Sequence, residues 1–306
     1  MTVDSGTTRN PAAGSGRRAK SRPPGTRAGR TRLRAMTGMW NTLGVLIFVV
    51  LGFPVYWMLN TAFKKQSEWQ NFNPHFTPAH PTFQNFSGAF HSSNFTDDLK
   101  NSLIITFGAV IVSLVIGFFG ALAIARFTFY GKRVVIFVVL LVQMVPLIVL
   151  VIPVYLTLGD LHGRDSLWGI ILTYLVFTVP YTVWTLRGFI ANIPRELDEA
   201  ALVDGCNRWQ TFTRIILPLT GPGLVATSVY GFIQAWNEFI LITTINHDKT
   251  KQNMMAWLVD TATGSRGTDW GVLMAGATIT SIPVVILFLA IQKNIATGLT
   301  AGAVKG

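Results

Sequence analysis

Six long apolar runs are the feature that most constrains how this chain can fold. Hydrophobic residues make up 50% of the 306 residues and charged residues only 13%, against roughly 25% charged in an ordinary soluble domain. Each run approaches or exceeds the ~20 residues that an α-helix needs to cross a ~30 Å hydrocarbon layer. The runs do not alternate as barrel strands do, so helices are the conformation that satisfies their backbone in lipid. We therefore expect an all-α integral membrane protein with six transmembrane helices, over residues 40–60, 103–125, 134–158, 168–185, 221–244 and 271–291.

Basic residues are distributed unevenly among the segments that join these runs. Nine of the 25 Lys and Arg residues precede the first run, where Asp4 is the only acidic residue. The N-terminal segment, the second and fourth loops and the C-terminal segment together hold 18 of the 25. Because cytoplasmic segments carry the excess of Lys and Arg, we expect both termini and the loop at 186–220 to be cytoplasmic. The predicted location is the cytoplasmic (inner) cell membrane, crossed in multiple passes.

Residues 1–38 differ in composition from the rest of the chain. They are rich in Gly, Pro, Ser, Thr and Arg and lack apolar periodicity, which predicts a disordered basic cytoplasmic tail before a membrane domain at 39–306. Anionic lipid beside the tail accounts for its charge, so we expect no nucleic-acid partner. The single cysteine and the five histidines show no metal-ligand spacing, and we expect neither a metal site nor a catalytic residue.

The cytoplasmic loop between the fourth and fifth runs carries signals for two short helices. Pro194 suits the first turn of a helix over 192–204, and the acidic residues that follow complement the positive end of the helix dipole. Gly205 supplies the left-handed stop. Asn207 can then cap a second helix, with Gln210 at the capping-box position. We expect a helix-turn-helix hairpin on the cytoplasmic surface.

The first helix of this hairpin has a small, partly apolar face beside a row of carboxylates. Residues at helical spacing form this face: Leu197, Ala200, Ala201 and Asp204. A face of this shape can enter the groove of a partner protein, or it can pack against the chain's own spans. Geometry alone favours neither alternative.

One spacing pattern in the same loop resembles a known signature. Glu199-Ala200-Ala201 is followed by three residues, Gly205, nine residues, Ile215, one residue and Leu217-Pro218. At every fixed position this is similar to the signature of the inner-membrane permease subunits of binding-protein-dependent ABC importers. The resemblance implies that the loop forms coupling helices that seat in a cleft of an ATP-hydrolysing subunit. The residues predicted for this ATPase-coupling loop are Glu199, Ala200, Ala201, Asp204, Gly205, Ile215, Leu217 and Pro218.

Two further stretches, 235–239 and 298–306, resemble the maltose-type carbohydrate permeases within that family. The resemblance implies a sugar importer that contains a second homologous permease subunit, two ATPase subunits and an extracellular solute-binding protein. The chain has no Gly-x-x-x-x-Gly-Lys-Ser/Thr phosphate loop, so ATP is expected on the partner ATPase and no cofactor on this chain. The expected function is transport, and the chain is not expected to be an enzyme.

Polar residues within the spans indicate a candidate translocation pathway, because polar groups are costly in lipid. Tyr230, Gln234, Asn237 and Glu238 lie near one face of the fifth run. Hydroxyl-rich sugars need hydrogen bonds and stacking surface, which three residues of the third and fourth runs can add: Gln143, Tyr174 and Tyr181. The alternative is that these groups bond between helices, and Glu238 can equally be an interhelical anchor or a gate.

Other functions stay open on the sequence. A permease of the same fold can carry another solute, such as glycerol phosphate, an amino acid or a peptide. A phosphate-bearing solute would favour basic residues inside the spans, which are absent apart from terminal positions. A membrane scaffold or signalling subunit whose basic tail is the working part is an alternative of a different class.

Overall fold

The computed structural model describes residues 27–70, 75–264 and 267–303, with side chains described for 36–70, 75–264 and 267–292. The described residues form helices, turns and loops without a strand. Contacts within the chain divide it into two compact units, residues 1–54 and 55–306. The all-α class predicted from the apolar runs is confirmed.

The first helix, α1 (Arg27–Ala62), corrects one prediction about the basic tail. Residues 27–38, which we expected to be disordered, are helical. The physical reason is that Arg, Ala, Leu and Met are good helix formers, and adding a residue to an existing helix costs far less than starting one. The expected disorder of residues 1–26 concerns a segment outside the described residues.

The segment after α1 is held by hydrogen bonds to its own backbone. It contains two short helices, α2 (Gln66–Trp69) and α3 (Gln84–His91). Asn85 donates its side-chain amide to the carbonyls of Ala62 and Lys64 at 2.8 and 2.7 Å. The backbone amides of Ala79 and His80 donate to the Glu68 carboxylate, and the Ala79 bond is the main cause of a lowered pKa of that carboxyl. The described part of this loop is therefore ordered.

Two long helices form the centre of unit 55–306, α4 (Phe95–Arg126) and α7 (Leu167–Ala191). A β-carbon added to Gly117 on α4 would lie 2.5 Å from Thr182 Cγ2 on α7, so only glycine permits this approach. The hydroxyls of Ser113 and Thr182 are 3.0 Å apart at the same contact. A small residue such as Gly117 thus allows the two helices to pack closely.

The third apolar run is broken rather than kinked. We expected one helix over 134–158, and the structure has α5 (Lys132–Met144) and α6 (Leu147–Asp160) at 104° to each other. Pro146 lies in the break, and it has no backbone amide hydrogen to continue α5. The helix direction therefore changes within the run.

The fifth run also departs from the single helix expected over 221–244. Helix α11 (Gly221–Trp236) ends early, and α12 (Ile240–Ile245) starts after a short turn. The Glu238 carboxylate accepts hydrogen bonds from the backbone amides of Leu241 and Ile242. These bonds satisfy backbone amides in the first turn of α12 that have no partner within the helix. The carboxylate therefore favours the start of a new helix over the continuation of α11.

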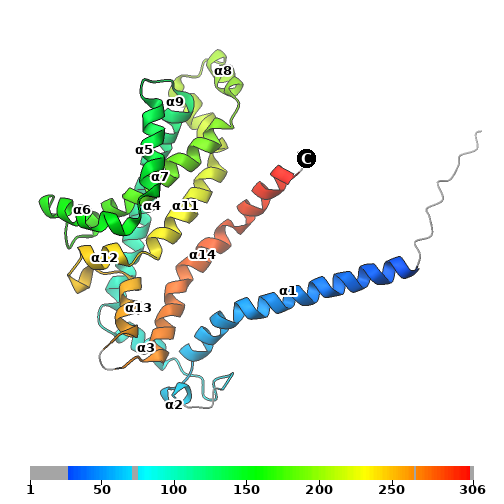
Figure 1. Cartoon of the computed structure of the whole chain (residues 1–306), viewed down its shortest axis with the longest axis vertical. Coiled ribbons are helices and arrows are strands. Elements are labelled where there is room, and N and C mark those ends of the chain that lie inside the picture. The colour runs from blue at the N-terminus through cyan, green and yellow to red at the C-terminus, as the bar shows by residue number, and fades with distance from the viewer. Residues whose placement is uncertain (1–26, 71–74, 265–266, 304–306) are drawn as a thin grey trace, which may run out of the picture. The chain divides into compact units, whose positions relative to one another are not determined.

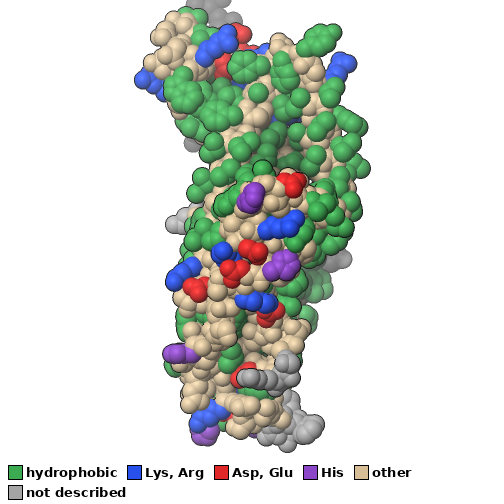
Figure 2. All heavy atoms as spheres, turned by 90° about the vertical axis from the view of Figure 1, so that its left-hand side faces the viewer, with side chains coloured by type: hydrophobic (Ala, Val, Ile, Leu, Met, Phe, Trp, Pro, Cys, Tyr) green, Lys and Arg blue, Asp and Glu red, His purple; other side chains and the backbone are tan. Residues whose placement is uncertain are grey.

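The chain then continues through η2 (Lys249–Lys251) and α13 (Met254–Ala262) to the last helix, α14 (Trp270–Ala303). In Figure 1 α11 and α14 are drawn in yellow and in orange to red. Four described helices are long and apolar enough to cross a membrane, and counting each bent helix pair as one span gives up to six. On the face that carries α6 and α12, hydrophobic side chains form a band next to charged groups (Figure 2). This pattern agrees with the multi-pass protein expected.

Candidate coupling hairpin and translocation cavity

The first half of the predicted hairpin is α8 (Arg195–Val203), which starts after Pro194 and has Asp204 as its C-cap. Gly205 follows with φ of +83°, a left-handed conformation that glycine adopts at little cost. The amide of Cys206 donates to the carbonyl of Ala201 at 2.9 Å. This closure satisfies a carbonyl at the helix end and turns the chain back, as the sequence predicted.

The second half begins with the predicted capping box. The Asn207 side chain accepts from the Gln210 amide and the Gln210 side chain accepts from the Asn207 amide, each at 2.8 Å. Helix α9 (Arg208–Thr211) continues into a π-helical turn, η1 (Phe212–Ile216), and then into α10 (Leu217–Leu219). A bend of 66° separates this stretch from α11. The hairpin is therefore covalently continuous with a membrane helix.

The predicted apolar face of α8 is divided between the inside and the outside. Ala201 is buried, with 4% of its surface exposed, and it faces the rest of the chain. Glu199 and Ala200 are exposed, and Val203 is 87% exposed. The outward surface thus runs along Glu199, Ala200 and Val203. Of the remaining predicted coupling residues, Asp204, Gly205 and Pro218 are exposed, whereas Ile215 and Leu217 are half-buried.

An ion pair that the sequence did not predict positions the hairpin. Arg126 at the end of α4 has Nε 3.0 Å from Oδ2 of Asp198 on α8, and its side chain is only 8% exposed. It also donates from Nη2 to the carbonyl of Ile193, in the turn before α8, at 3.0 Å. One arginine thereby fixes both the start and the first turns of α8. The acid at 198 was visible in the sequence, but its partner 72 positions away was not.

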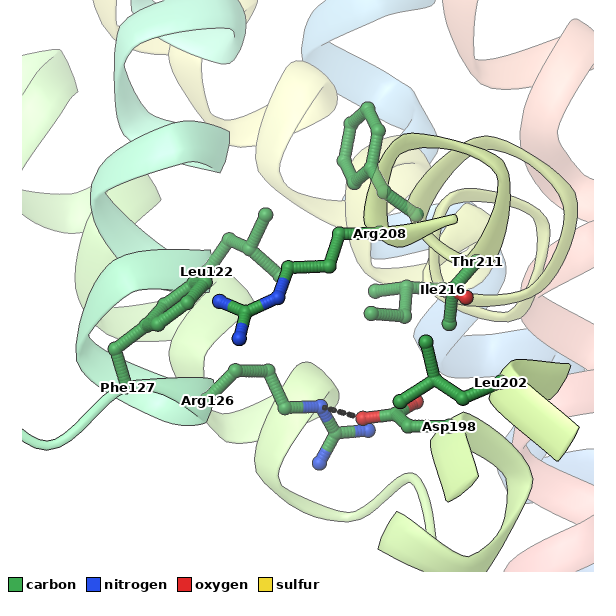
Figure 3. A pocket seen from close by; sticks show the side chains of 9 residues that line it. Leu122, Arg126, Phe127, Asp198, Leu202, Arg208, Thr211 and Ile216 are labelled. Carbon is green, nitrogen blue, oxygen red and sulfur yellow. Dashed lines mark ion pairs between the residues drawn. The ribbon is translucent and has the colours of Figure 1, made fainter. Parts of the chain in front are cut away.

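The same arginine lines a cavity of about 300 Å³ beneath the hairpin (Figure 3). Arg126 extends into it from α4 and Arg208 from α9, with Leu122 and Phe127 on the α4 side. Phe212 and Ile216 close its other side and belong to an apolar cluster with α7. The hairpin therefore packs against apolar side chains and is held by an ion pair.

A second cavity, of about 250 Å³, lies where the broken third run meets α7 and α11. Five of the predicted pathway residues line it: Gln143, Tyr181, Tyr230, Gln234 and Glu238. The rings of Tyr181 and Tyr230 stack with centroids 3.6 Å apart and an angle of 22° between their planes. Gln234 donates its amide to the Tyr230 hydroxyl at 3.3 Å. The structure thus brings together polar and aromatic groups from three separate runs.

Glu238 joins three segments at the edge of this cavity. Tyr174 on α7 donates its hydroxyl to Glu238 Oε2 at 2.8 Å. The same carboxylate bonds the amides of Leu241 and Ile242, and the Glu238 carbonyl accepts from the side chain of Asn253 at 2.6 Å. Asn253 is also the N-cap of α13, where its side chain accepts from the Ala256 amide. These contacts favour the anchor interpretation over the gate.

Two predicted pathway residues lie outside the cavity lining. Tyr174 is completely buried, and its contribution is the bond to Glu238. Asn237 is the C-cap of α11, and its side-chain amide donates to the carbonyl of Ile233 in that helix. The apolar lining residues Phe177 and Leu147 were missed. Pro146 directly precedes Leu147, so a helix break predicted at this proline could have indicated that Leu147 lies at the cavity.

Comparison with known proteins adds independent observations. Residues 113–300 match the family described as "Binding-protein-dependent transport system inner membrane component". The chain is 44% identical over 266 residues to the diacetylchitobiose uptake system permease protein DasC of Streptomyces coelicolor, covering 87% of this chain and 96% of the relative. It is 33% identical to the trehalose transport system permease protein SugB of Mycobacterium tuberculosis, covering 87% of this chain and 97% of that protein.

A solved structure has the same fold. A chain of a bacterial ABC transporter involved in the import of the acidic polysaccharide alginate superposes with a TM-score of 0.73 at 21% identity. The match covers 89% of this chain and 99% of that one.

Proposed function

Because the chain belongs to the family of binding-protein-dependent transport system inner membrane components, we propose that it is the permease subunit of an ATP-driven sugar importer. The chain is a non-catalytic transport subunit, and ATP is used by partner ATPase subunits. The observation that carries the sugar assignment is the cavity with the stacked Tyr181 and Tyr230 rings, bordered by the amides of Gln143 and Gln234. Two relatives are named for diacetylchitobiose and trehalose uptake, which supports the same solute class.

The chemistry of the cavity fits a sugar better than the alternative solutes. Aromatic rings offer apolar surface to the C–H groups of a sugar ring, while amides and a carboxylate can bond its hydroxyls. No Lys or Arg lines the cavity, so a phosphate-bearing solute lacks a counter-charge there. The volume of about 250 Å³ is close to the lower end of the ~300–1,000 Å³ range of ligand pockets.

The coupling loop connects this cavity to the ATPase in our proposal. The outward surface of α8, with Glu199, Ala200 and Val203, enters a groove of the ATPase. Movement of α8 reaches the cavity through α9, η1 and α10, which continue into α11, the helix that carries Tyr230 and Gln234. The residues of the signature act by docking and by shaping this loop.

The complete importer contains a second homologous permease, two ATPase subunits and an extracellular solute-binding protein. Both termini of this chain are cytoplasmic, as the excess of basic residues in those segments indicates. ATP binds to the partner ATPase subunits in our proposal, because the phosphate loop that would hold it is absent from the sequence of this chain.

Uptake kinetics test the sugar assignment. Tyr230→Leu removes the aromatic surface that we propose contacts the sugar. With the ~0.5–1.5 kcal/mol of an aromatic contact as the scale for the lost ring–sugar contact, we expect the KM for a transported sugar to rise about 2- to 13-fold. The measurement is uptake of labelled diacetylchitobiose and trehalose in cells that express the complete importer. Tyr130→Leu is the control, since Tyr130 is fully exposed and outside the cavity. An unchanged KM for every sugar transported by the wild type would contradict the assignment.

Cross-linking tests the docking surface separately. Cys206 is the single cysteine, so Cys206→Ser provides a background for placing new thiols. Val203→Cys, at an 87% exposed position, should cross-link to the ATPase subunit, whereas Ala201→Cys, at a 4% exposed position, should not. Cross-linking at position 201 but not at 203 would show that another face of α8 docks.

A further inference from the structure

A third cavity lies at the opposite end of α4 from the coupling hairpin. Its volume is about 340 Å³, and its lining includes Ser92 and Asn94 before α4, Asp98 on the first turns of α4, and Gln252, Trp257 and Asp260 from the segment before α14. None of these residues belongs to the predicted pathway or to the coupling loop. The cavity thus joins two segments about 150 positions apart in the sequence.

Two buried oxygens in this lining have no hydrogen-bond donor among the described residues. Asp98 is 3% exposed and Gln252 is 4% exposed, and the atoms without a partner are Asp98 Oδ1 and Gln252 Oε1. Buried polar atoms in proteins are almost always paired, and an unpaired one points to a missing water or ion. Both atoms are acceptors, so the group that satisfies them carries positive charge or donates hydrogen bonds.

The orientation of the Gln252 amide is fixed by its surroundings. Its side-chain Nε2 donates to the backbone carbonyl of Asn246 at 2.6 Å. Separately, the backbone carbonyl of Gln252 accepts from the Asn101 side chain at 3.0 Å, which ties this segment to α4. Exchanging the nitrogen and oxygen of the amide would place two acceptors against each other. Gln252 Oε1 is therefore held as an available acceptor.

The charges around Asp98 favour a cation over water. A buried carboxylate needs a counter-charge, and the lysine in the same lining, Lys249, is already paired with Asp260 at 2.6 Å. When Asp98 is ionised, the two carboxylates and one lysine of the lining leave one uncompensated negative charge. Burial disfavours the ionised form of Asp98 unless a cation is bound beside it. Carboxylate, amide and hydroxyl oxygens are the ligands that Ca²⁺ prefers.

We propose that this cavity binds Ca²⁺ through Asp98 and the side-chain oxygen of Gln252, with Asp260 as a further ligand when it leaves Lys249. The site combines two carboxylates with neutral oxygens. The described residues contain no group of three or more His, Cys, Asp or Glu side chains that could hold a metal ion. The proposed site therefore depends on neutral oxygens as well as on carboxylates. A bound ion would tie the start of α4 to the segment that carries α13. Through Asn253, next to Gln252, it would stabilise the contact to Glu238 at the edge of the translocation cavity.

Terbium luminescence tests the site in the full chain, purified into nanodiscs of phosphatidylcholine. Tb³⁺ replaces Ca²⁺ at oxygen sites, and Trp257 in the cavity lining can sensitise its emission. We expect sensitised emission from the wild type that Ca²⁺ displaces, and a Ca²⁺-dependent rise in Tm. Asp98→Asn should weaken binding at least about tenfold, since changes at metal sites cost ~10–100-fold even beyond the direct ligands.

Two further variants separate this site from ordinary surface binding. Asp97→Asn removes the neighbouring carboxylate, which is 56% exposed and outside the lining, so it should weaken binding far less than Asp98→Asn. Lys249→Met releases Asp260 from its ion pair and should strengthen binding. Equal signals from the wild type and Asp98→Asn, or an equal loss in Asp97→Asn, would overturn the proposal. A complete absence of Ca²⁺-dependent change, which water or a protonated Asp98 would give, would also overturn it.

Discussion

The coupling hairpin and the translocation cavity are built in different ways, although α11 is continuous with both. The hairpin is shaped by neighbours in the sequence: Gly205 turns the chain, and Asn207 and Gln210 cap each other. The cavity depends on distant partners, such as Tyr174 and Glu238, which are 64 positions apart. Local hydrogen bonds therefore determine the shape of the hairpin, and tertiary packing determines the shape of the cavity that we propose as the solute pathway. The Arg126–Asp198 pair is the exception, because it positions a locally encoded hairpin through a distant contact.

The largest effect should come from removing the Arg126–Asp198 ion pair. Asp198→Ala leaves Arg126 buried without its ionic partner, and we expect a loss of about 3 kcal/mol in the free energy of unfolding, the lower end for one side of a buried pair. Thermal unfolding of the purified protein gives the value. Glu199→Ala is the matched control, since Glu199 is the exposed next residue of α8 and its loss should change stability little. A similar effect of both changes would mean that the hairpin holds its position without the ion pair.

The next effect concerns the cavity. Glu238→Gln retains one oxygen but places an NH₂ group beside the donors that the carboxylate now accepts, and we expect a cost of about 2 kcal/mol. An anchor role predicts that the Tm and the uptake rate fall together. Tyr174→Phe, which removes only one of the bonds, should cost about 1 kcal/mol. Loss of uptake at an unchanged Tm would instead assign Glu238 to a gate.

A backbone change tests the local design of the hairpin. At φ of +83° a β-branched residue is strained, so Gly205→Val should cost about 1–2 kcal/mol and lower the ratio of correctly to incorrectly shaped hairpin about 5- to 30-fold. Uptake should fall while membrane insertion persists and the ATPase loses its stimulation by solute. Gly205→Asn is the control, because Asn tolerates this conformation better. Equal activity of both variants would show that docking does not require this turn.

The smallest effect is expected at the capping box. Asn207→Ala removes the side-chain acceptor of the Gln210 amide, and loss of such a cap costs about 1 kcal/mol. Asn192→Ala provides the comparison, since Asn192 ends α7 through its backbone amide alone. Hydrogen exchange of the α9 amides should increase in the first variant only. Unchanged exchange would show that packing of Phe212 and Ile216, rather than the cap, holds α9.

The features predicted well are those with a local cause. Gly205 has a left-handed backbone and Asn207 forms the capping box, because each depends on side chains within a few positions. The breaks within the third and fifth runs were missed. Pro146 removes one helix hydrogen bond, but this loss alone does not set the 104° change of direction. At Glu238 the break depends on hydrogen bonds of its carboxylate to α7 and α12. The inward orientation of Ala201 was also beyond prediction, since helical spacing places residues on one face without saying what that face contacts.

The sequence by itself determined the membrane class, the helical hairpin with its caps, and the family signature from Glu199 to Pro218. Apolar run length, turn conformation and residue spacing are properties of the chain alone, which is why they could be read directly. Only the tertiary structure decided that Arg126 pairs with Asp198, that Gln143, Tyr181, Tyr230 and Gln234 meet in one cavity, and that Tyr174 donates to Glu238. Each of these depends on which side chains from distant segments approach within hydrogen-bond or ionic distance. Helix packing fixes such approaches, and no single segment specifies them.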